Sequence, residues 1–368
     1  MPYAHITGWG MAAPETILTN DDLSKMVETN DAWIRERTGI RERHIAKDGQ
    51  TTSSLGAEAA LKALAVANLR PTDLDLIICS TSSPDHIFPA TACIIQDQIG
   101  ATKAGAFDLS AACSGFIYAT NMAAQSIRSG SIKNALVIGA ETLSRFVNWK
   151  DRGTCILFGD GAGAFVLQAS EKPGGVYSAV MHSDGSGADS LTLLGGGSRY
   201  PATEATIHEG KHFIEMDGKE VFRFATRVMA QATHEALDAA GLSIEQVNWI
   251  VPHQANIRII DAAARGLKLP MDRFVVNIER YGNTSTASIP IALVEAVEKG
   301  QIKKGDKLVM VGFGAGLTWG ALTAEWTGPI PGKGSHIYPT QYRVLGRVRS
   351  LIRRAIRFIE GIIFRREL

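Results

Sequence analysis

The sequence has little of what defines several large classes of protein. It holds four cysteines in 368 residues, in neither a zinc-ligand pattern nor a dense disulfide framework, so we expect reduced thiols in a cytosolic compartment. No run approaches the roughly 18 to 20 uncharged apolar residues that a membrane-spanning helix needs. The first residues lack the layout of a secretory signal. The formal net charge of +1 argues against a dedicated nucleic-acid binder.

What is present indicates a large layered core. With 368 residues and 45% hydrophobic content, two domains or a duplicated one are expected. Apolar runs of four to eight residues recur between amphipathic segments, as is typical of buried strands that alternate with helices. These runs lie at 74–79, 135–140, 247–251 and 308–313. They predict an α/β fold of packed layers.

An internal repeat relates the two halves of the sequence. A shift of 173 residues takes Leu64 to Leu237 and, well beyond it, Gly139 to Gly312. Because separate blocks keep one register, we favour a duplication over two unrelated α/β units.

Cys113 is the first candidate for chemistry. The same shift carries it onto Thr286, and both lie in turns of small residues that lead into apolar helical stretches. The two helices would therefore begin face to face, with Asn283 near Cys113. A helix N-terminus would lower the pKa of the thiol and make it a nucleophile. The alternative is a small buried core cysteine, which suits Cys79 and Cys155.

His253 and Asn283 are the other candidates. His253 follows the strand-like run 248–251, where α/β folds place catalytic groups, although a lone histidine is more often structural. Asn283 follows a glycine in an expected tight turn and could simply cap a helix. The glycine run 312–320 follows the last long apolar run. The run lacks the lysine that a phosphate-binding P-loop needs. We therefore favour the interpretation that its backbone amides line a reactive thioester.

At these motifs the sequence resembles the ketoacyl-acyl-carrier-protein synthase III family, which has the thiolase fold. The resemblance runs from about residue 3 to 327 and includes, in the family's order, TNDDLSKMVETNDAWIRERTGIRERHIA, DLSAACSGF, FGDGAGA, VPHQANIRII, YGNTSTASIP and GFGAGLTWG. It implies two duplicated α/β halves that form a layered αβαβα core, followed by a C-terminal amphipathic helix. The expected boundaries are 1–173, 174–328 and, for a linker and basic helical tail, 329–368.

The resemblance implies an acyltransferase that starts fatty-acid synthesis by decarboxylative Claisen condensation of an acyl-CoA primer with malonyl-acyl-carrier protein. Cys113 would take up the acyl group, and His253 and Asn283 would donate hydrogen bonds to the malonyl thioester oxygen. Backbone N–H groups of Cys113 and Ala315 would hold the oxyanion of acyl transfer. Ala315 stands where many members have glycine. Acyl-CoA and the carrier protein are substrates, and no cofactor or metal is expected.

The resemblance also implies binding surfaces. The expected CoA-binding residues are Trp33, Arg37, Arg152 and Asn256, with adenine between Trp33 and Arg152. Lys219 stands where the family often has asparagine. The expected walls of the acyl pocket are Phe88, Leu143, Phe158 and Phe313. Phe88 would close the pocket of the partner in a homodimer. The expected carrier-protein surface is Arg223, Arg258 and Arg265. Helix packing by Trp33 and merely solvated arginines are the alternatives.

The resemblance leaves residues 332–368 unexplained. This tail carries nine Lys and Arg against two Glu, a net of +7 that leaves −6 on the rest of a chain whose total is +1. Apolar residues recur in 342–366 at three- and four-residue spacing, which predicts a basic amphipathic helix. They are Leu345, Val348, Leu351, Ile352, Ile356, Ile359, Ile362 and Ile363. Peripheral contact with an anionic membrane is one interpretation. Docking on a protein and a disordered tail are the others.

Three functions stay open on the sequence. The first is the primer-condensing enzyme, expected in the cytoplasm with its tail at the inner membrane surface. The second is a relative that serves polyketide or specialised lipid synthesis, or that transfers acyl groups without condensation. The third is a membrane-recruited scaffold without turnover. The identity of the primer depends on the depth of the acyl pocket, which one sequence does not show.

Overall fold

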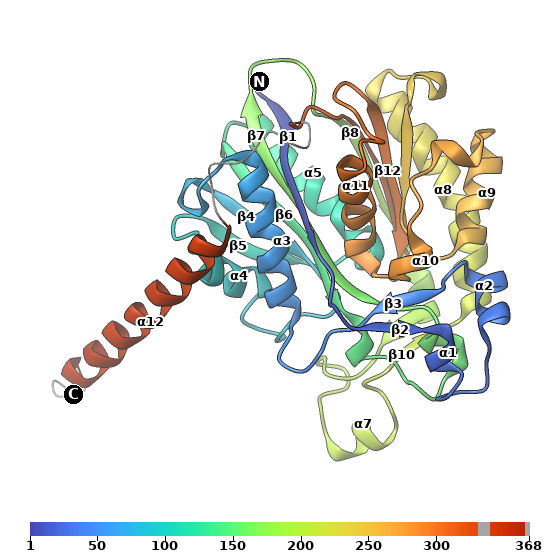
Figure 1. Ribbon diagram of the computed structural model, residues 1–368, viewed down its shortest axis with the longest axis horizontal. Helices are drawn as coiled ribbons and strands as arrows, with labels where there is room; N and C mark the ends of the chain where they lie inside the picture. Colours follow the sequence, from blue (N-terminus) through green and yellow to red (C-terminus); the bar gives the residue numbers. More distant parts are fainter. Residues whose placement is uncertain (330–338, 365–368) are drawn as a thin grey trace.

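Two mixed β-sheets with the same strand order form the centre of the molecule (Figure 1). The computed structural model describes residues 1–329 and 339–364. The strands are β1 (Tyr3–Ala12), β2 (Ile17–Thr19), β3 (Glu42–His44), β4 (Leu76–Ser80), β5 (Gly105–Leu109), β6 (Asn134–Thr142), β7 (Asp160–Ser170), β8 (Val176–Ser183), β9 (Leu191–Leu193), β10 (Ile214–Met216), β11 (Trp249–Pro252), β12 (Lys307–Gly314) and β13 (Thr318–Glu325).

The helices alternate with these strands over most of the chain. They are α1 (Asn20–Leu23), α2 (Asp31–Thr38), α3 (Thr52–Ala67), α4 (Thr91–Ile99), α5 (Gly115–Arg128), α6 (Arg152–Cys155), α7 (Glu204–His208), α8 (Gly218–Ala240), α9 (Ile257–Leu267), α10 (Ile278–Tyr281), α11 (Ser288–Glu298) and α12 (Pro339–Phe364). The alternation is what the apolar runs predict.

The first sheet has the order β1-β7-β6-β4-β5, and the second, read in the same sense, β8-β13-β12-β11. The corresponding pairs β6 with β4 and β12 with β11 are parallel, and the next strand in each sheet, β7 or β13, is antiparallel. Strands β4, β6, β11 and β12 coincide with the four predicted apolar runs, so these predictions are confirmed. The runs are continuous because helices cover both faces of each sheet.

Helices α5 and α11 lie between the sheets, α3 and α4 cover the outer face of the first, and α8 and α9 cover the outer face of the second (Figure 1). Three clusters of buried apolar side chains fill the spaces between these layers. The expected αβαβα core is therefore confirmed.

The duplication extends to backbone conformation. Ala112 and Ser285, separated by the 173-residue shift, both have positive φ, at 46° and 49°. Each opens a 3₁₀ turn that leads into a central helix, α5 or α11. The two starts touch, since Thr286 Oγ1 donates to Ser80 Oγ at 2.9 Å on the strand beside α5. The predicted pair of facing helix starts is confirmed, whereas the domain boundaries stay a prediction.

Two details differ from or extend the expectations. Strand β13 follows the glycine run, which is thus a hairpin between β12 and β13 rather than the end of the strand pattern. The predicted C-terminal helix is present as α12 and reaches Phe364. Lys333 with the predicted linker 330–338, and Arg365 and Arg366, lie outside the described residues. Within the described ranges, no helix combines the length and apolarity needed to cross a membrane.

Candidate active site

Cys113 lies in the 3₁₀ turn directly before α5 and is 6% exposed. Burial raises the pKa of its thiol to about 12, while the Ser285 hydroxyl and the backbone N–H of Cys113 favour the thiolate. The negative charge of Glu141 adds to the effect of burial. The expected low pKa at a helix start is therefore wrong for the free protein, because desolvation outweighs the favourable groups.

His253 follows β11 and is 1% exposed. Burial lowers the pKa of the imidazole to about 3, so the ring is neutral near pH 7. Nδ1 lies 2.7 Å from Ser288 Oγ, and that hydroxyl oxygen accepts from the Gln254 backbone N–H at 3.3 Å. With the ring hydrogen on Nε2, the Ser288 hydroxyl donates to Nδ1 and Nε2–H remains as a donor.

Asn283 is held by its backbone beside the FGDGAGA segment. Its N–H donates to Leu157 O at 2.8 Å and its carbonyl accepts from Gly159 N at 3.0 Å. Gly159 must lack a side chain, because a Cβ there would lie 2.4 Å from Tyr281 O. Asn283 Oδ1 accepts from Ser285 N–H at 2.8 Å, which leaves the amide NH₂ of Asn283 as the donor.

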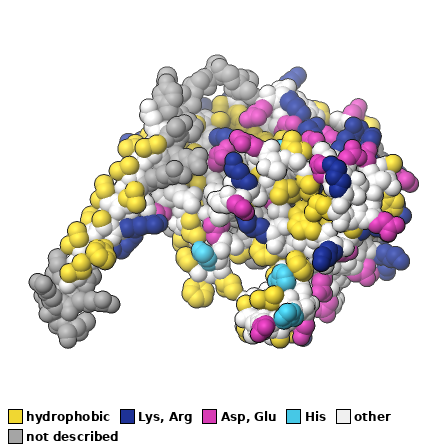
Figure 2. Space-filling model, turned by 60° about the horizontal axis from the view of Figure 1, so that its bottom comes forward, with side chains coloured by type: hydrophobic (Ala, Val, Ile, Leu, Met, Phe, Trp, Pro, Cys, Tyr) yellow, Lys and Arg dark blue, Asp and Glu magenta, His cyan; other side chains and the backbone are white. Residues whose placement is uncertain are grey.

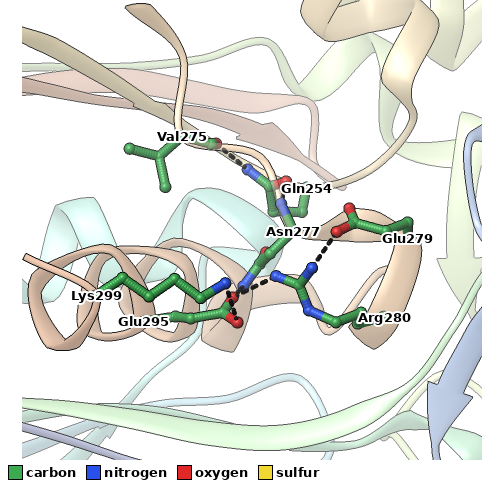
Figure 3. Close-up of polar contacts among 7 residues, drawn as sticks. All are labelled: Gln254, Val275, Asn277, Glu279, Arg280, Glu295 and Lys299. Atoms are coloured by element: carbon green, nitrogen blue, oxygen red, sulfur yellow. Dashed lines mark hydrogen bonds and ion pairs between the residues drawn. The ribbon is translucent and has the colours of Figure 1, made fainter. Parts of the chain in front are cut away.

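A polar network supports the loop that carries His253 (Figure 3). Gln254 Nε2 donates to Val275 O at 3.1 Å, and its Oε1 accepts from Asn277 N–H at 3.1 Å. Asn277 in turn donates to Glu295 on α11 at 2.9 Å. The cations that pair with Glu295 are Arg280, at 2.7 Å, and Lys299, at 2.8 Å. Because α11 also carries Ser288, the network ties the loop to the helix that orients the imidazole.

Two small cavities are lined by Cys113, and a larger outer cavity adjoins one of them. The inner cavity, of about 80 Å³, is lined among others by Cys113, His253, Asn283, Phe158 and Phe313. A second, of about 100 Å³, is lined by Cys113, Phe158, Leu143, Ser285 and Ala315. A large outer cavity, of about 1210 Å³, is lined by Trp33, Arg37, Asn256, Lys219, Arg223 and Arg258. Asn256 and Phe222 line both the outer and the inner cavity, so the two cavities adjoin.

Trp33 is flanked by two guanidinium groups at the outer cavity. The central guanidinium carbons of Arg37 and Arg152 lie 4.8 and 4.9 Å from the centre of the indole ring. Arg152 thus stacks on Trp33 itself, and an adenine between them would require Arg152 to move. Asn256 caps α9 and donates to Arg37 O at 2.9 Å.

Two of the predicted positions lie away from the cavities around Cys113. Phe88 is 85% exposed in this single chain and does not line the cavities that contain Cys113. Arg265 is exposed on α9, beyond the lining of the outer cavity that Arg223 and Arg258 border.

The sequence reasoning missed several residues of the site. Ser285 and Ser288 lie within the quoted YGNTSTASIP motif, but their contacts depend on tertiary structure. Glu141 is fully buried at the end of β6 and accepts from Ser83 Oγ at 2.5 Å and Ser82 N–H at 3.1 Å. Burial raises the pKa of its carboxyl to about 7. The sequence signal for Glu141 is an acidic residue directly after the apolar run 135–140, where a buried strand is expected to end.

The duplicated fold and a cysteine that shares its cavity with a neutral histidine and an asparagine define a condensing enzyme of the thiolase-like class. Family models described as 3-oxoacyl-[acyl-carrier-protein] synthase III and its C-terminal part match residues 107–185 and 237–326. The beta-ketoacyl-[acyl-carrier-protein] synthase III of Roseiflexus castenholzii is 51% identical over 325 residues, which are 88% of this chain and 98% of that protein.

Solved structures of the same family have the same fold as this chain. The 3-oxoacyl-[acyl-carrier-protein] synthase III of Aquifex aeolicus VF5 is 47% identical with a TM-score of 0.81, covering 88% of this chain and 99% of that one. The priming beta-ketosynthase of the R1128 polyketide pathway is 35% identical with a TM-score of 0.83, covering 89% and 97%. The chain belongs to the 3-oxoacyl-[acyl-carrier-protein] synthase III family, as the motifs predict.

Proposed function

We propose that Cys113 is the acyl acceptor, and His253 and Asn283 the paired donors, with which this enzyme condenses an acyl-CoA primer with malonyl-acyl-carrier protein to start fatty-acid synthesis. The observation that supports this assignment is that all three side chains line one buried cavity, with His253 Nε2 and the Asn283 amide left to donate. Over the described residues, no group of three or more His, Cys, Asp or Glu could hold a metal ion.

In the first half-reaction the Cys113 sulfur attacks the thioester carbon of acyl-CoA. The carbon–sulfur bond to CoA breaks, and the thiol proton ends on the CoA sulfur. Backbone N–H groups of Cys113 and Ala315 hold the oxyanion. Because burial keeps Cys113 protonated in the free protein, deprotonation accompanies substrate binding, and the N-terminus of α5 with the Ser285 hydroxyl stabilises the thiolate as it forms.

In the second half-reaction the malonyl thioester oxygen accepts hydrogen bonds from His253 Nε2–H and the Asn283 amide. Carbon dioxide leaves, and the negative charge that develops on that oxygen is stabilised by these two neutral donors. The resulting carbanion attacks the acyl carbon on Cys113, the bond from that carbon to sulfur breaks, and a 3-oxoacyl carrier protein leaves. Neutral donors suit this step because they stabilise the enolate oxygen by hydrogen bonds and do not transfer a proton to it.

Mass spectrometry of the protein after incubation with mixed acyl-CoAs tests the assignment. We expect one acyl group on the peptide that contains Cys113, and none after Cys113→Ser. Cys93→Ser is the matched control, because Cys93 is the exposed thiol among the four free cysteines. Labelling that persists in Cys113→Ser, or that disappears in Cys93→Ser, contradicts the assignment. The same spectra identify the preferred primer.

A second candidate function is priming of a specialised polyketide pathway. It is favoured by the likeness to the R1128 priming beta-ketosynthase. The two functions differ in the acyl chain that the cavity lined by Leu143, Phe158 and Ala315 accepts. Rates of malonyl-dependent condensation across a series of straight and branched acyl-CoAs distinguish them.

We also propose a cytoplasmic homodimer in which Phe88 reaches the acyl pocket of the partner. Ile87 and Phe88 are 77% and 85% exposed, which is unusual for large apolar side chains, and they lie on one loop. Arg223 and Arg258 border the outer cavity, and with Arg265 they form the proposed surface for the acidic carrier protein. Light scattering of wild type and Phe88→Asp tests the dimer. A monomeric wild type contradicts it.

A further inference from the structure

Helix α12 is an addition to the family fold. The C-terminal family model ends at residue 326, and relatives are covered almost completely by about 325 residues of this chain. Helix α12 (Pro339–Phe364) leaves the body beside α4 and projects away from it (Figure 1). The helix thus has a role that the shared catalytic fold does not require.

The start of α12 is fastened to the body through small and polar side chains. Ser350 Oγ donates to Asp97 Oδ2 at 2.5 Å. Gly346 packs against the end of α4 so closely that a Cβ on it would lie 2.5 Å from Gln98 O. Helical spacing puts Gly346 and Ser350 on one side of the helix, and this side is turned to the body over the first turns of α12.

The apolar stripe of α12 is about half exposed along its length, and only at its start do Leu345, Val348 and Ile352 line a cavity with Ile99 and Gly100 of the body. The described members of the stripe are Val344, Leu345, Val348, Leu351, Ile352, Ile356, Ile359 and Ile362, and each is between 48% and 66% exposed. Figure 2 shows these hydrophobic side chains along the projecting helix, with basic side chains beside them. An amphipathic helix normally gains its stability by burying the apolar face. Beyond Ile352 the helix projects away from the body (Figure 1), so this part of the stripe is available to another partner.

The charge on α12 indicates which partner. Arg349, Arg353, Arg354 and Arg357 have described side chains, against the single acid Glu360 in the same part of the helix. At about 100° per residue, Arg349 and Arg354 lie at the two edges of the stripe. Arginines that flank a broad apolar face are typical of helices that lie in an anionic lipid interface. The net of +7 in 332–368 contrasts with −6 on the remaining chain, so the attraction to anionic lipid resides in this tail.

A second copy of the helix fits the stripe less well. A seam between two helices needs apolar residues at two positions per heptad, whereas this stripe spans roughly 140° of the helix. Pairing of two copies would also bring arginines of both helices together, and their like charges would repel. Among the described residues of 349–360, Glu360 is the acid that could offset this repulsion.

We propose that α12 is an interfacial anchor that lies in an anionic membrane leaflet, with the apolar stripe in the acyl region and the flanking Arg349 and Arg354 on lipid phosphates. The anchor leaves the active site open. Helices α2, α8 and α9 border the outer cavity and lie on the side of the molecule opposite α12 (Figure 1). Substrates in solution reach Trp33 and Asn256 while the enzyme is bound to the membrane.

Vesicle co-sedimentation of the full chain tests the anchor, and it is independent of catalysis. The vesicles are equal parts phosphatidylglycerol and phosphatidylcholine, or phosphatidylcholine alone. We expect binding to the anionic vesicles, with at least a tenfold weaker affinity for the neutral ones. Ile352→Asp with Ile359→Asp removes the stripe and should abolish binding. Replacing Arg349, Arg353, Arg354 and Arg357 with Gln should weaken it by more than about 100-fold.

Matched variants keep the result interpretable. Replacing the same four arginines with Lys keeps the charge and should retain binding, and thermal unfolding confirms that each variant is folded. Absence of wild-type binding to anionic vesicles overturns the proposal, as does undiminished binding by the Ile352→Asp, Ile359→Asp variant. A wild type that ignores vesicles but loses oligomeric mass on the same double substitution shows that a second copy covers the stripe, which also overturns it.

Discussion

His253 Nδ1 lies 2.7 Å from the Ser288 hydroxyl at the start of α11, so the two helix starts of the duplicated fold contribute to one reaction centre. One start carries Cys113 and the other carries Ser288, which is hydrogen-bonded to Nδ1 of the imidazole. The duplication thereby brings Cys113, the proposed nucleophile, and Ser288, which supports the proposed donor His253, to one site.

Ser288→Ala should slow the condensation but spare acyl transfer. Without the hydroxyl, Nδ1 no longer has its donor, and the tautomer that donates from Nε2 loses its preference. We expect kcat for malonyl-dependent condensation to fall by about 10- to 100-fold, with the rate of Cys113 acylation within about twofold of wild type. Ser288→Thr, which keeps a hydroxyl, should recover most of the rate. An equal loss in both half-reactions would show that Ser288 acts through packing alone.

The neutrality of His253 gives a pH dependence of stability. Burial lowers the pKa of His253 from 6.5 to about 3, so below about pH 6.5 the unfolded chain binds a proton that the folded protein does not. His253 therefore lowers the free energy of unfolding progressively as pH falls from about 6.5 towards 3. Urea unfolding of wild type and His253→Gln across this window measures it. We expect the variant to lose less stability on acidification. Parallel curves would contradict a neutral buried imidazole.

Glu141 is predicted to hold down the reactivity of Cys113. Its charge is among the causes that raise the pKa of the thiol, so Glu141→Gln should favour the thiolate and speed alkylation of Cys113 at pH 8. Glu235→Gln, on α8 and paired with His182, is the control. Because the pKa of Glu141 is raised from 4.5 to about 7, the folded protein holds a proton that the unfolded chain releases. Stability from this group is thus lost as pH rises from about 4.5 through 7, and the Gln variant should lack that loss.

Much of the fold could be predicted because its strands are covered on both faces. A strand such as β6 then appears as a continuous apolar run, and β4, β11 and β12 do so for the same reason. The conserved register of the 173-residue repeat predicted that the starts of α5 and α11 are equivalent. The placement of Asn283 beside Cys113 followed from that symmetry.

The electrostatics and the docking of α12 could not be predicted in this way. The pKa of Cys113 depends on how deeply the turn is buried, and the sequence showed the helix start but not the desolvation. Periodicity defined the two faces of α12, but which face meets the body depends on Gly346 and Ser350 fitting the end of α4. Stacking of Arg152 on Trp33 likewise joins segments more than a hundred residues apart.

Trp33→Ala tests the predicted nucleotide subsite. The ring lies next to the guanidinium groups of Arg37 and Arg152 and lines the outer cavity, which does not include Cys113. Loss of a stacking platform should raise KM for acyl-CoA by about tenfold and leave kcat nearly unchanged. The same primer on pantetheine, which lacks the nucleotide, should show no change in KM. A rise in KM with both substrates, together with a lower melting temperature, would mean that Trp33 serves helix packing.

Gly314→Ala should disable the enzyme through the backbone of Cys113. A Cβ at Gly314 would lie 2.5 Å from Cys113 N and 3.0 Å from Ala112 Cβ, so the turn that holds the nucleophile must shift. Displacement of a reacting group by about 1 Å can cost about 100-fold in rate, and we expect both acyl transfer and condensation to fall by that order. The strain should also lower the free energy of unfolding by about 1–3 kcal/mol.

Two further variants separate this effect from glycine replacement in general. Gly185→Ala adds a Cβ where no atom lies within 4 Å, and it should leave both half-reactions unchanged. Ala315→Gly keeps the backbone N–H proposed for the oxyanion and should stay within about twofold of wild type, because a backbone donor does not depend on its side chain. If Gly314→Ala matched Gly185→Ala in both half-reactions, contact with the β12–β13 hairpin would not be what positions Cys113.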